Sequence, residues 1–542
     1  GSAIKPITYL AAFEKDWTPA TLIWDVPSEF PPSGTEGDPS APYVPVNYDG
    51  RFHGPVTVRS ALANSYNIPA VKALQYVGIY DDPATLQEDG FIAMAKRLGI
   101  TSLTRPDYGL SLTLGGGEVS LLELTGAYAV IANEGRRVAP VAVTKVVDYT
   151  GQTVFEYTPP AGDQVIREAH AFLISSILSD PEARAPMFGY PSVLDLPFAA
   201  AAKTGTTNDY RDNWTLGYTP DLVVGVWVGN ADYSPMVNTT GVSGAAPIWA
   251  RVMQDGISLI YGGQATPFRQ PADIEDEVIC AVSGTKPSEW CPSTRVEYFA
   301  SDQLPAPKEE DLWKEVEIDT WTGLKASAAC AELTKRELVI NVTDKFAIRW
   351  LKETEEGRQW ADNYGFPNPP VILPERECQP DDPHAIIELN LVNGQTIREN
   401  PFKIIGIIDA TANFQDFRID WGEGEDPTEW NVLVDWNNDP AHTPQEIYEW
   451  DLTEVEAPVV TLRVLMRSTV DTQAEKRFTL ALEVPTPTPT ETPTPTLTPT
   501  PTETPTLTPT PMPSPTATPT APPIVPTLPP IPTETTVTTG TP

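Results

Sequence analysis

The chain has 542 residues, which is too long for one hydrophobic core and predicts several domains. Its 73 acidic residues outnumber the 36 basic ones, so the formal net charge is −37. A field of this sign repels phosphate backbones and anionic lipid surfaces, which excludes nucleic acids and membrane surfaces as expected partners. The sequence also contains no secretory signal and no run of about 20 apolar residues that would predict a transmembrane helix.

The first predicted element is a helix from Ser2 to Glu14, which begins with the pattern S-x-x-K. Residues three apart on a helix share a face, so Ser2 and Lys5 can meet. A serine hydroxyl becomes a nucleophile when a base takes its proton, and a neutral lysine can be that base. The alternative for this motif alone is structural: Ser2 caps the helix and Lys5 is solvated.

Residues 58–64 and 69–76 predict two further helices, separated by Ser65-Tyr66-Asn67. Ser and Asn at such a junction are typical of turns and helix caps. In a catalytic reading, the Ser65 hydroxyl relays a proton to a leaving group and the Asn67 amide holds a peptide carbonyl.

Residues 119–133 predict a buried helix, and residues 140–157 a hairpin with its turn at Tyr149–Gly151. Three strands are predicted at 197–207, 213–218 and 222–228. The short turn at 219–221 indicates that the last two strands are antiparallel.

The first of these strands carries the pattern K-T-G-T at Lys203–Thr206. A strand edge can pair with an extended peptide, and Gly205 removes a side chain where a substrate must approach closely. The backbone N–H groups of Thr206 and Ser2 could form an oxyanion hole, where one donor contributes about 2.7–4 kcal/mol to transition-state stabilisation. The alternative is a strand that ends in a polar turn.

The four cysteines lie between residues 266 and 382, a proline-rich region with no clear predicted core. None forms C-x-x-C or has a histidine at zinc-ligand spacing, so no metal site is expected. Disulfides are favoured, which fits an extracytoplasmic compartment, and inert free thiols are the alternative. The local choice among three pairings is Cys280–Cys291 with Cys330–Cys378.

The C-terminal part of the chain changes in style. Across residues 383–484, six alternating runs separated by turn signals predict an immunoglobulin-like or fibronectin-like β-sandwich, with strands at 385–392, 402–408, 417–421, 430–436, 459–466 and 478–484. Residues 485–542 are a Pro-Thr repeat, which predicts an extended, disordered tail because it offers little apolar surface to bury.

Taken together, S-x-x-K, S-x-N and K-T-G-T occur in the order that is the signature of active-site serine enzymes with a lysine base. The flanking sequences of the three motifs, and the segment Leu114–Asn133, resemble class A penicillin-binding proteins over residues 1 to about 260. The resemblance implies an α/β transpeptidase domain at 1–265, with an antiparallel sheet and helices. It also implies an N-terminally truncated chain whose sheet lacks its opening strands.

The resemblance further implies a peptidoglycan D,D-transpeptidase that cross-links stem peptides ending in D-Ala-D-Ala, with β-lactams as covalent inhibitors and no cofactor. It implies the following roles: Ser2 as nucleophile, Lys5 as base, Ser65 in proton transfer, Lys203 in the same network, and Asn67, Thr204, Gly205 and Thr206 in substrate binding. An upstream glycosyltransferase domain and membrane anchor would place the enzyme on the outer face of the bacterial cell membrane.

Two alternatives remain open. A serine β-lactamase would need a base for deacylation, but no glutamate between Asn67 and Lys203 has an asparagine four residues later, as the class A lactamase segment requires. A non-catalytic β-lactam sensor or cell-surface module is the second alternative, with its function in the sandwich and tail.

Overall fold

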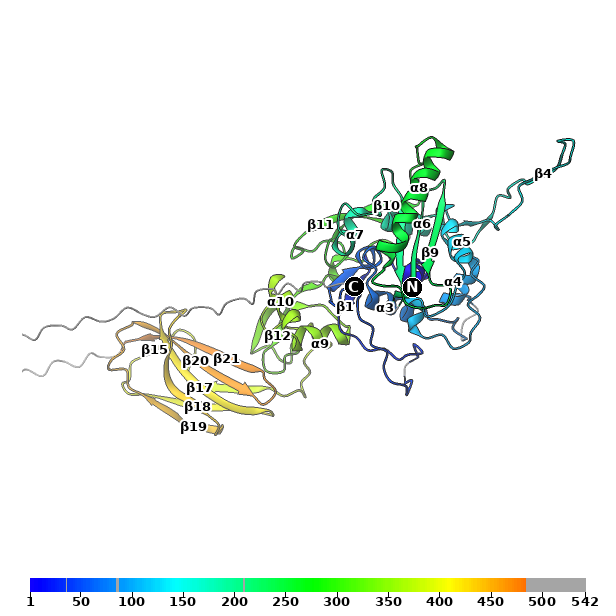
Figure 1. Ribbon diagram of the computed structural model, residues 1–542. Helices are drawn as coiled ribbons and strands as arrows, with labels where there is room; N and C mark the ends of the chain where they lie inside the picture. The colour runs from blue at the N-terminus through cyan, green and yellow to red at the C-terminus, as the bar shows by residue number, and fades with distance from the viewer. Residues whose placement is uncertain (36, 84–86, 208–209, 484–542) are drawn as a thin grey trace, which may run out of the picture. The chain divides into compact units, whose positions relative to one another are not determined.

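The computed structural model describes residues 1–35, 37–83, 87–207 and 210–483, all within one compact unit (Figure 1). The predicted Pro-Thr tail lies outside the described residues. No helix in the described ranges is both long and apolar enough to cross a membrane. The N-terminal elements, up to residue 261, are η1 (Ser2–Ile4), α1 (Lys5–Phe13), β1 (Leu22–Asp25), β2 (Gly54–Thr57), α2 (Val58–Ala63), α3 (Asn67–Val77), α4 (Phe91–Arg97), η2 (Leu110–Leu114), α5 (Leu121–Ala132), β3 (Arg136–Arg137), β4 (Lys145–Val147), β5 (Thr153–Glu156), β6 (Asp163–Gln164), α6 (Glu168–Leu178), α7 (Pro181–Phe188), β7 (Ala201–Thr206), β8 (Asp212–Tyr218), β9 (Val223–Gly229), η4 (Gly241–Ala245) and α8 (Ala246–Tyr261).

Helix α1 is central to this part of the fold. Every one of its nine residues is buried, including Lys5, and it contacts α3, α4 and α6. A helix that is apolar around its circumference is stable only inside a core, and Ile7, Leu10 and Phe13 are fully enclosed here. The S-x-x-K motif is thereby fixed in the interior of the domain, with Ser2 in the preceding 3₁₀ turn.

The turn between α2 and α3 corrects one sequence prediction. Ser65 lies in the turn between the two helices, as predicted, whereas Asn67 is neither a turn nor a cap residue: the N-cap of α3 is Tyr66, and Asn67 is the first helical residue. Ser65 has φ = 63°, a left-handed conformation that few non-glycine residues adopt. This backbone turn, rather than side-chain capping, brings the Ser65 and Asn67 side chains together.

Strands β7, β8 and β9 form an antiparallel sheet in that order, as predicted for the last two. Alternation along β7 directs Ala201 into the core formed with α1, α5 and α6, and Ala202 into a second core with Trp249 and Met253 of α8. Figure 1 shows α8 beside β9 in this part of the chain. The sheet is therefore held by helices on both faces, which fixes the position of the K-T-G-T strand.

Two shorter N-terminal elements also match the sequence predictions. The helix α5 carries a capping box in which Ser120 Oγ accepts a hydrogen bond from Glu123 N, at 3.1 Å. The hairpin β4–β5 pairs Lys145 with Glu156 and turns through Gly151, which has φ = 85°. Both elements lie close to their predicted bounds.

Region 266–382 has a core of its own, which sequence analysis did not find. Its elements are β10 (Ile274–Cys280), β11 (Thr294–Ala300), η5 (Lys308–Glu310), β12 (Trp313–Asp319), β13 (Thr334–Ile340), α9 (Lys345–Glu353) and α10 (Glu355–Asn363). Trp24 of β1 packs in this core with Trp313 and Trp350. The core joins residues that are hundreds of positions apart in the sequence, so no short sequence pattern predicts it.

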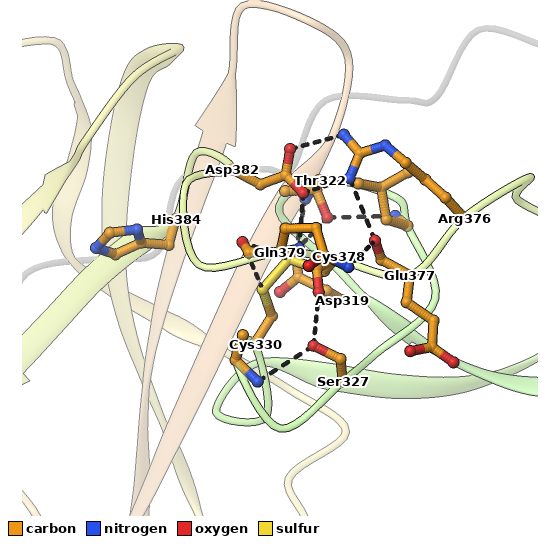
Figure 2. The surroundings of a disulfide bond; sticks show 12 residues. Asp319, Thr322, Ser327, Cys330, Arg376, Glu377, Cys378, Gln379, Asp382 and His384 are labelled. Carbon is orange, nitrogen blue, oxygen red and sulfur yellow. Dashed lines mark hydrogen bonds and ion pairs between the residues drawn. A yellow bond between two sulfur atoms is a disulfide. The ribbon is translucent and has the colours of Figure 1, made fainter.

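The two disulfides of this region are Cys280–Cys291 and Cys330–Cys378, which is the local pairing. Figure 2 shows the second, where Ser327 Oγ donates to the Cys378 carbonyl at 2.6 Å. Nearby, Arg376 forms a two-pronged ion pair with Asp382, at 2.6 and 2.7 Å.

A buried ion pair ties the hairpin β10–β11 to the N-terminal part. Arg59 of α2 donates to the Glu297 carboxylate on β11 through Nε, at 2.8 and 3.0 Å, and through Nη2, at 2.5 Å. The Glu297 side chain is fully buried and that of Arg59 is 6% exposed. Breaking such a pair leaves an uncompensated charge in the interior, so the two segments stabilise each other.

The C-terminal described region contains two sheets. The first has the order β14-β16-β19 and the second β15-β21-β20-β17-β18, from β14 (Ala385–Leu389), β15 (Gln395–Ile397), β16 (Phe402–Ala410), β17 (Phe414–Glu423), β18 (Asn431–Asn437), β19 (Ala441–Trp450), β20 (Val459–Ser468) and β21 (Gln473–Leu482). Inward residues such as Ile404 and Leu462 from the two sheets share one buried core. Sequence analysis predicted six of these strands and missed β15 and β19.

Candidate active site

The three sequence motifs meet at one cavity of about 650 Å³. Ser2 comes from the turn before α1, Ser65 and Asn67 from the α2–α3 junction, and Thr204, Gly205 and Thr206 from β7. The remaining lining residues are Tyr48, Asn64, Leu114, Met187, Phe188, Thr207, Tyr210, Thr240 and Val242. None of the described lining residues is a carboxylate, although the chain as a whole is strongly acidic.

Lys5 is completely buried and is held by the second motif. Its Nζ donates to the Asn67 Oδ1 atom at 2.7 Å, the Tyr66 carbonyl at 3.0 Å and the Ser65 carbonyl at 2.5 Å. Nζ also lies 3.4 Å from Ser65 Oγ. Ser2 and Lys5 were expected to meet directly, but within the described residues the hydrogen bonds of Lys5 run to the second motif rather than to the Ser2 hydroxyl.

Lys203 approaches the same serine from the sheet. Its Nζ donates to Ser65 Oγ at 2.7 Å and to the Thr204 carbonyl at 3.0 Å, and the residue is 2% exposed. Ser65 Oγ therefore lies between two lysine nitrogens. All the acceptors of these two lysines are neutral carbonyl, hydroxyl or amide oxygens.

This environment makes both lysines unusual bases. Burial lowers the pKa of Lys5 well below its ordinary value, and the positive charge of Lys203 lowers it further, whereas Asp25 acts in the opposite direction. Burial also lowers the pKa of Lys203 to about 7. Desolvation disfavours the ammonium form, so burial favours the neutral amine in both lysines, and Lys203 is partly neutral near neutral pH.

The third motif packs against the nucleophile turn. A Cβ atom added to Gly205 would lie 3.0 Å from the Ala3 nitrogen and 3.3 Å from the Ser2 nitrogen, so only glycine leaves room here. The Thr206 hydroxyl accepts a hydrogen bond from Gly241 N at 2.9 Å, which orients it at the cavity wall. The close approach of β7 brings the Thr206 backbone beside the start of η1.

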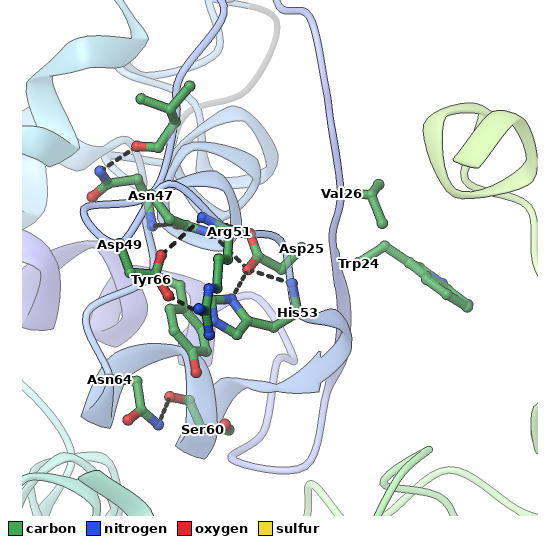
Figure 3. Close-up of polar contacts among 12 residues, drawn as sticks. Trp24, Asp25, Val26, Asn47, Asp49, Arg51, His53, Ser60, Asn64 and Tyr66 are labelled. Atoms are coloured by element: carbon green, nitrogen blue, oxygen red, sulfur yellow. Dashed lines mark hydrogen bonds and ion pairs between the residues drawn. The ribbon is translucent and has the colours of Figure 1, made fainter. Parts of the chain in front are cut away.

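Sequence analysis missed a polar network behind the second motif, drawn in Figure 3. Asn47 Nδ2 donates to both carboxylate oxygens of the fully buried Asp25, at 2.7 and 2.9 Å, while Asn47 Oδ1 accepts from Asn67 N at 2.7 Å. His53 Nδ1 lies 2.6 Å from Asp25 Oδ2, and its ring stacks on Tyr66. These residues lie at a strand end and in a loop without periodicity, where a single sequence gives no signal.

No group of three or more His, Cys, Asp or Glu side chains that could hold a metal ion occurs among the described residues. The arrangement brings together a serine hydroxyl at the cavity, two buried lysines of lowered pKa and a second serine hydroxyl that contacts both lysines, which are groups that nucleophilic catalysis can use.

Comparisons with known proteins agree with this geometry. Residues 1–254 match the family of the penicillin binding protein transpeptidase domain, and residues 270–311 match the penicillin-binding protein 1A C-terminal domain. Penicillin-binding protein 2D of Bacillus subtilis is 31% identical over 56% of this chain and 42% of its own length. Penicillin-binding protein 1A of Aquifex aeolicus is 35% identical over 47% of this chain and 32% of its own length.

Among solved structures, penicillin-binding protein 1A from Haemophilus influenzae is 25% identical, with a TM-score of 0.47 over 56% of this chain and 48% of that one. The chain spans less than half the length of the two curated relatives named above. The family match covers all three motifs and every residue of the cavity described above. Residues 1–254 form a penicillin-binding protein transpeptidase domain, homologous to that of class A penicillin-binding proteins.

Proposed function

We propose that this domain is a peptidoglycan D,D-transpeptidase that acts on stem peptides ending in D-Ala-D-Ala. The observation that carries the proposal is that Ser2 and Ser65 line one cavity, and that two buried lysines, whose hydrogen-bond acceptors are all neutral, contact Ser65 from behind it. The roles of the individual residues below are part of the proposal.

In the first step, Ser2 Oγ attacks the carbonyl carbon of the penultimate D-Ala, and neutral Lys5 takes the hydroxyl proton. The C–O bond forms as the carbonyl becomes an oxyanion, which the N–H groups of Ser2 and Thr206 stabilise. The lowered pKa of Lys5 supports this role because a lysine with an ordinary pKa would be protonated and unable to accept the proton.

In the second step, the C–N bond to the terminal D-Ala breaks, and its amine needs a proton. Ser65 Oγ is 2.7 Å from Lys203 Nζ and 3.4 Å from Lys5 Nζ, which supports transfer through Ser65 from a protonated lysine to the leaving nitrogen. An amine of a second stem peptide then attacks the acyl-enzyme and regenerates Ser2. A water in place of the amine would give carboxypeptidase activity.

Substrate binding follows from the cavity walls. The Thr204 and Thr206 hydroxyls with Lys203 provide donors for the terminal carboxylate, and Gly205 lets β7 lie close to the Ser2 turn. Asn67 Nδ2 already donates to the Val46 carbonyl at 2.7 Å, so a substrate carbonyl would share or replace that acceptor. The lack of a carboxylate in the described lining suits an anionic substrate.

The second candidate, a β-lactamase, requires a group that activates water on the acyl-enzyme. No carboxylate in the described cavity lining fills that position, which favours a long-lived acyl-enzyme. Labelling with a fluorescent penicillin distinguishes the candidates: a transpeptidase retains the label for many minutes, and a β-lactamase releases it within seconds. A non-catalytic sensor would retain the label but release no D-Ala from a peptide ending in D-Ala-D-Ala.

The matched control is Ser2→Ala, which should abolish both labelling and D-Ala release while leaving thermal unfolding unchanged. Normal cross-linking by Ser2→Ala would overturn the assignment of the nucleophile.

For the rest of the chain, we propose domain boundaries at 265, 382 and 484, with an immunoglobulin-like or fibronectin-like sandwich at 383–484. The two sheets with a common core support the sandwich. We further propose that the protein works at the outer face of the bacterial membrane together with an upstream glycosyltransferase domain and anchor.

A further inference from the structure

A set of polar residues outside the three motifs holds the second motif from behind. Asp25 ends β1, and its carboxylate is fully buried although no lysine or arginine pairs with it in the described structure. It is instead surrounded by donors: the Asn47 amide, the His53 backbone N–H at 3.2 Å and His53 Nδ1 at 2.6 Å. A buried carboxylate is costly unless donors satisfy it, so this group must stay assembled for the domain to remain stable.

Asn47 transmits this arrangement to the α2–α3 turn. Its amide nitrogen is fixed by Asp25 and by the Arg51 carbonyl at 2.8 Å. Its oxygen therefore points at the Asn67 backbone N–H, which belongs to the first turn of α3 and has no partner within the helix. The same Asn67 presents Oδ1 to Lys5 at 2.7 Å.

His53 provides a second contact with the same turn. Its ring lies parallel to that of Tyr66, with centroids 3.9 Å apart and an interplanar angle of 17°. Tyr66 is the middle residue of the second motif, and its carbonyl accepts a hydrogen bond from Lys5. His53 Nε2 lies 3.2 Å from Asp49 Oδ2, so the ring is held at both nitrogens.

We propose that Asp25, Asn47 and His53 are positioning residues that fix the Ser65-Tyr66-Asn67 turn and, through it, the oxygen atoms that hold Lys5. We call these three residues the Asp25 group. Two of the acceptors of Lys5, Asn67 Oδ1 and the Tyr66 carbonyl, belong to residues that the group contacts directly. The strained backbone of Ser65, with φ = 63°, needs such support because its relaxed conformation would move Ser65 Oγ away from both lysines.

The Asp25 group does not line the cavity, so it acts on the chemistry through Lys5 and the turn rather than by binding substrate. This inference rests on the proposed function for its kinetic readout, but the geometry of the turn can be measured without any substrate. The test therefore uses two independent measurements on the 542-residue chain.

The first variant is Asn47→Ala, which removes the acceptor of the Asn67 amide. We expect its first-order acylation constant with a fluorescent penicillin to fall about tenfold, which corresponds to one hydrogen bond, while reversible binding changes less than about twofold. We also expect faster hydrogen exchange of the Asn67 amide. A general loss of folding would instead raise exchange throughout the domain and weaken binding.

Two substitutions of His53 separate its contacts and remain informative if Asn47→Ala folds poorly. His53→Asn keeps a donor near Asp25 without the ring, and His53→Phe keeps the ring without the donor. We expect His53→Asn to acylate within about threefold of the unchanged chain and His53→Phe to be several-fold slower, because an unsatisfied buried carboxylate displaces Asn47. The matched control is His442→Phe, which removes the ring nitrogen from another His–Asp pair, with Asp409 at 2.7 Å, in the C-terminal β-rich region.

Unchanged acylation and unchanged exchange at Ser65–Asn67 in Asn47→Ala and His53→Phe would overturn the inference. If the unchanged chain bound no penicillin, the proposed function would fail, whereas exchange at the turn would still decide whether the Asp25 group positions it.

Discussion

The cavity and the C-terminal β-rich region both contain buried charged side chains, but they differ in whether an oppositely charged group compensates the charge. In the cavity, Lys5 and Lys203 are enclosed with neutral acceptors only. In the β-rich region, Asp420 of β17 is fully buried between Arg418, at 2.7 Å, and Arg463, at 2.9 Å. An uncompensated buried charge shifts its protonation equilibrium, whereas a compensated one holds the fold together. The difference separates a reactive site from a structural one.

The largest expected effect is on the acylation rate, when a buried lysine at the cavity is replaced. Lys5→Met should lower penicillin acylation by about a thousandfold, because the general base is lost. The free energy of unfolding should change little, because the desolvation cost of a buried ammonium disappears while the acceptors of Ser65, Tyr66 and Asn67 lose their donor. Stopped-flow acylation and urea unfolding measure the two quantities. A large loss of stability would contradict the view that Lys5 is buried at a cost to the fold.

Asp420→Ala should have the opposite outcome, with a loss of stability and no loss of acylation. It leaves Arg418 and Arg463 without their shared partner, so we expect the β-rich region to lose about 3 kcal/mol of stability. Acylation by penicillin should not change. Thermal unfolding followed by tryptophan fluorescence reports the first effect, and an equally fast acylation reaction is the internal control. A drop in acylation would show that the two regions are coupled.

A smaller effect concerns pH. In the proposed mechanism acylation requires neutral Lys5, so its rate should rise as the pH passes the pKa of Lys5. The charge of Lys203 lowers that pKa, and Lys203→Met removes the charge. The pKa of Lys5 should therefore rise, and the increase in acylation rate should move to higher pH. Lys203→Arg keeps the charge and should leave the increase near its original position. The pH profile of the acylation constant distinguishes the two variants, and equal profiles would remove Lys203 from the electrostatic argument.

The smallest expected effect is the difference in stability between variants that lack one or the other disulfide. Cys330–Cys378 has a sequence separation of 48, so its removal by Ser substitution should cost about 4 kcal/mol from chain entropy. For Cys280–Cys291 the separation is 11, and the expected cost is about 1 kcal/mol smaller. Denaturant unfolding of the two double variants gives the difference. Acylation should survive the loss of Cys330–Cys378 if the cavity does not depend on the part of region 266–382 that this disulfide joins.

Sequence reasoning succeeded where a short segment carries its own signal. The apolar periodicity of α1 and the turn between β8 and β9 are local features, and each of the three motifs is likewise a short segment. It failed where distant residues cooperate: the core around Trp24, Trp313 and Trp350 joins three widely separated segments. Strand β19 was missed for a different reason. It is an edge strand with several charged residues and Pro444, so its pattern resembles a loop.

In the candidate site, the sequence placed all three motifs in one cavity but not the contacts between them. The direct contact expected between Ser2 and Lys5 depends on helix spacing alone, whereas the structure directs Lys5 to Asn67 Oδ1 and to the carbonyls of the turn. Ser65 acquires its position from a left-handed backbone conformation, which no propensity argument predicts for serine. The roles of Asp25 and Asn47 could not be predicted from the sequence either, because a hydrogen-bond network leaves no periodic pattern in it.

The ion pair between Arg59 and Glu297 has a practical consequence for dissecting this protein. The change of composition near residue 265 suggests a cut there, yet such a cut would remove the buried Glu297 carboxylate from Arg59, which would keep the longer ion pair with Asp180 at 3.3 Å. The hairpin β10–β11 therefore supports the N-terminal domain across the proposed boundary at residue 265. Trp24 of β1 also packs with Trp313 and Trp350, so we expect a shortened chain to fold well only if it extends through α10.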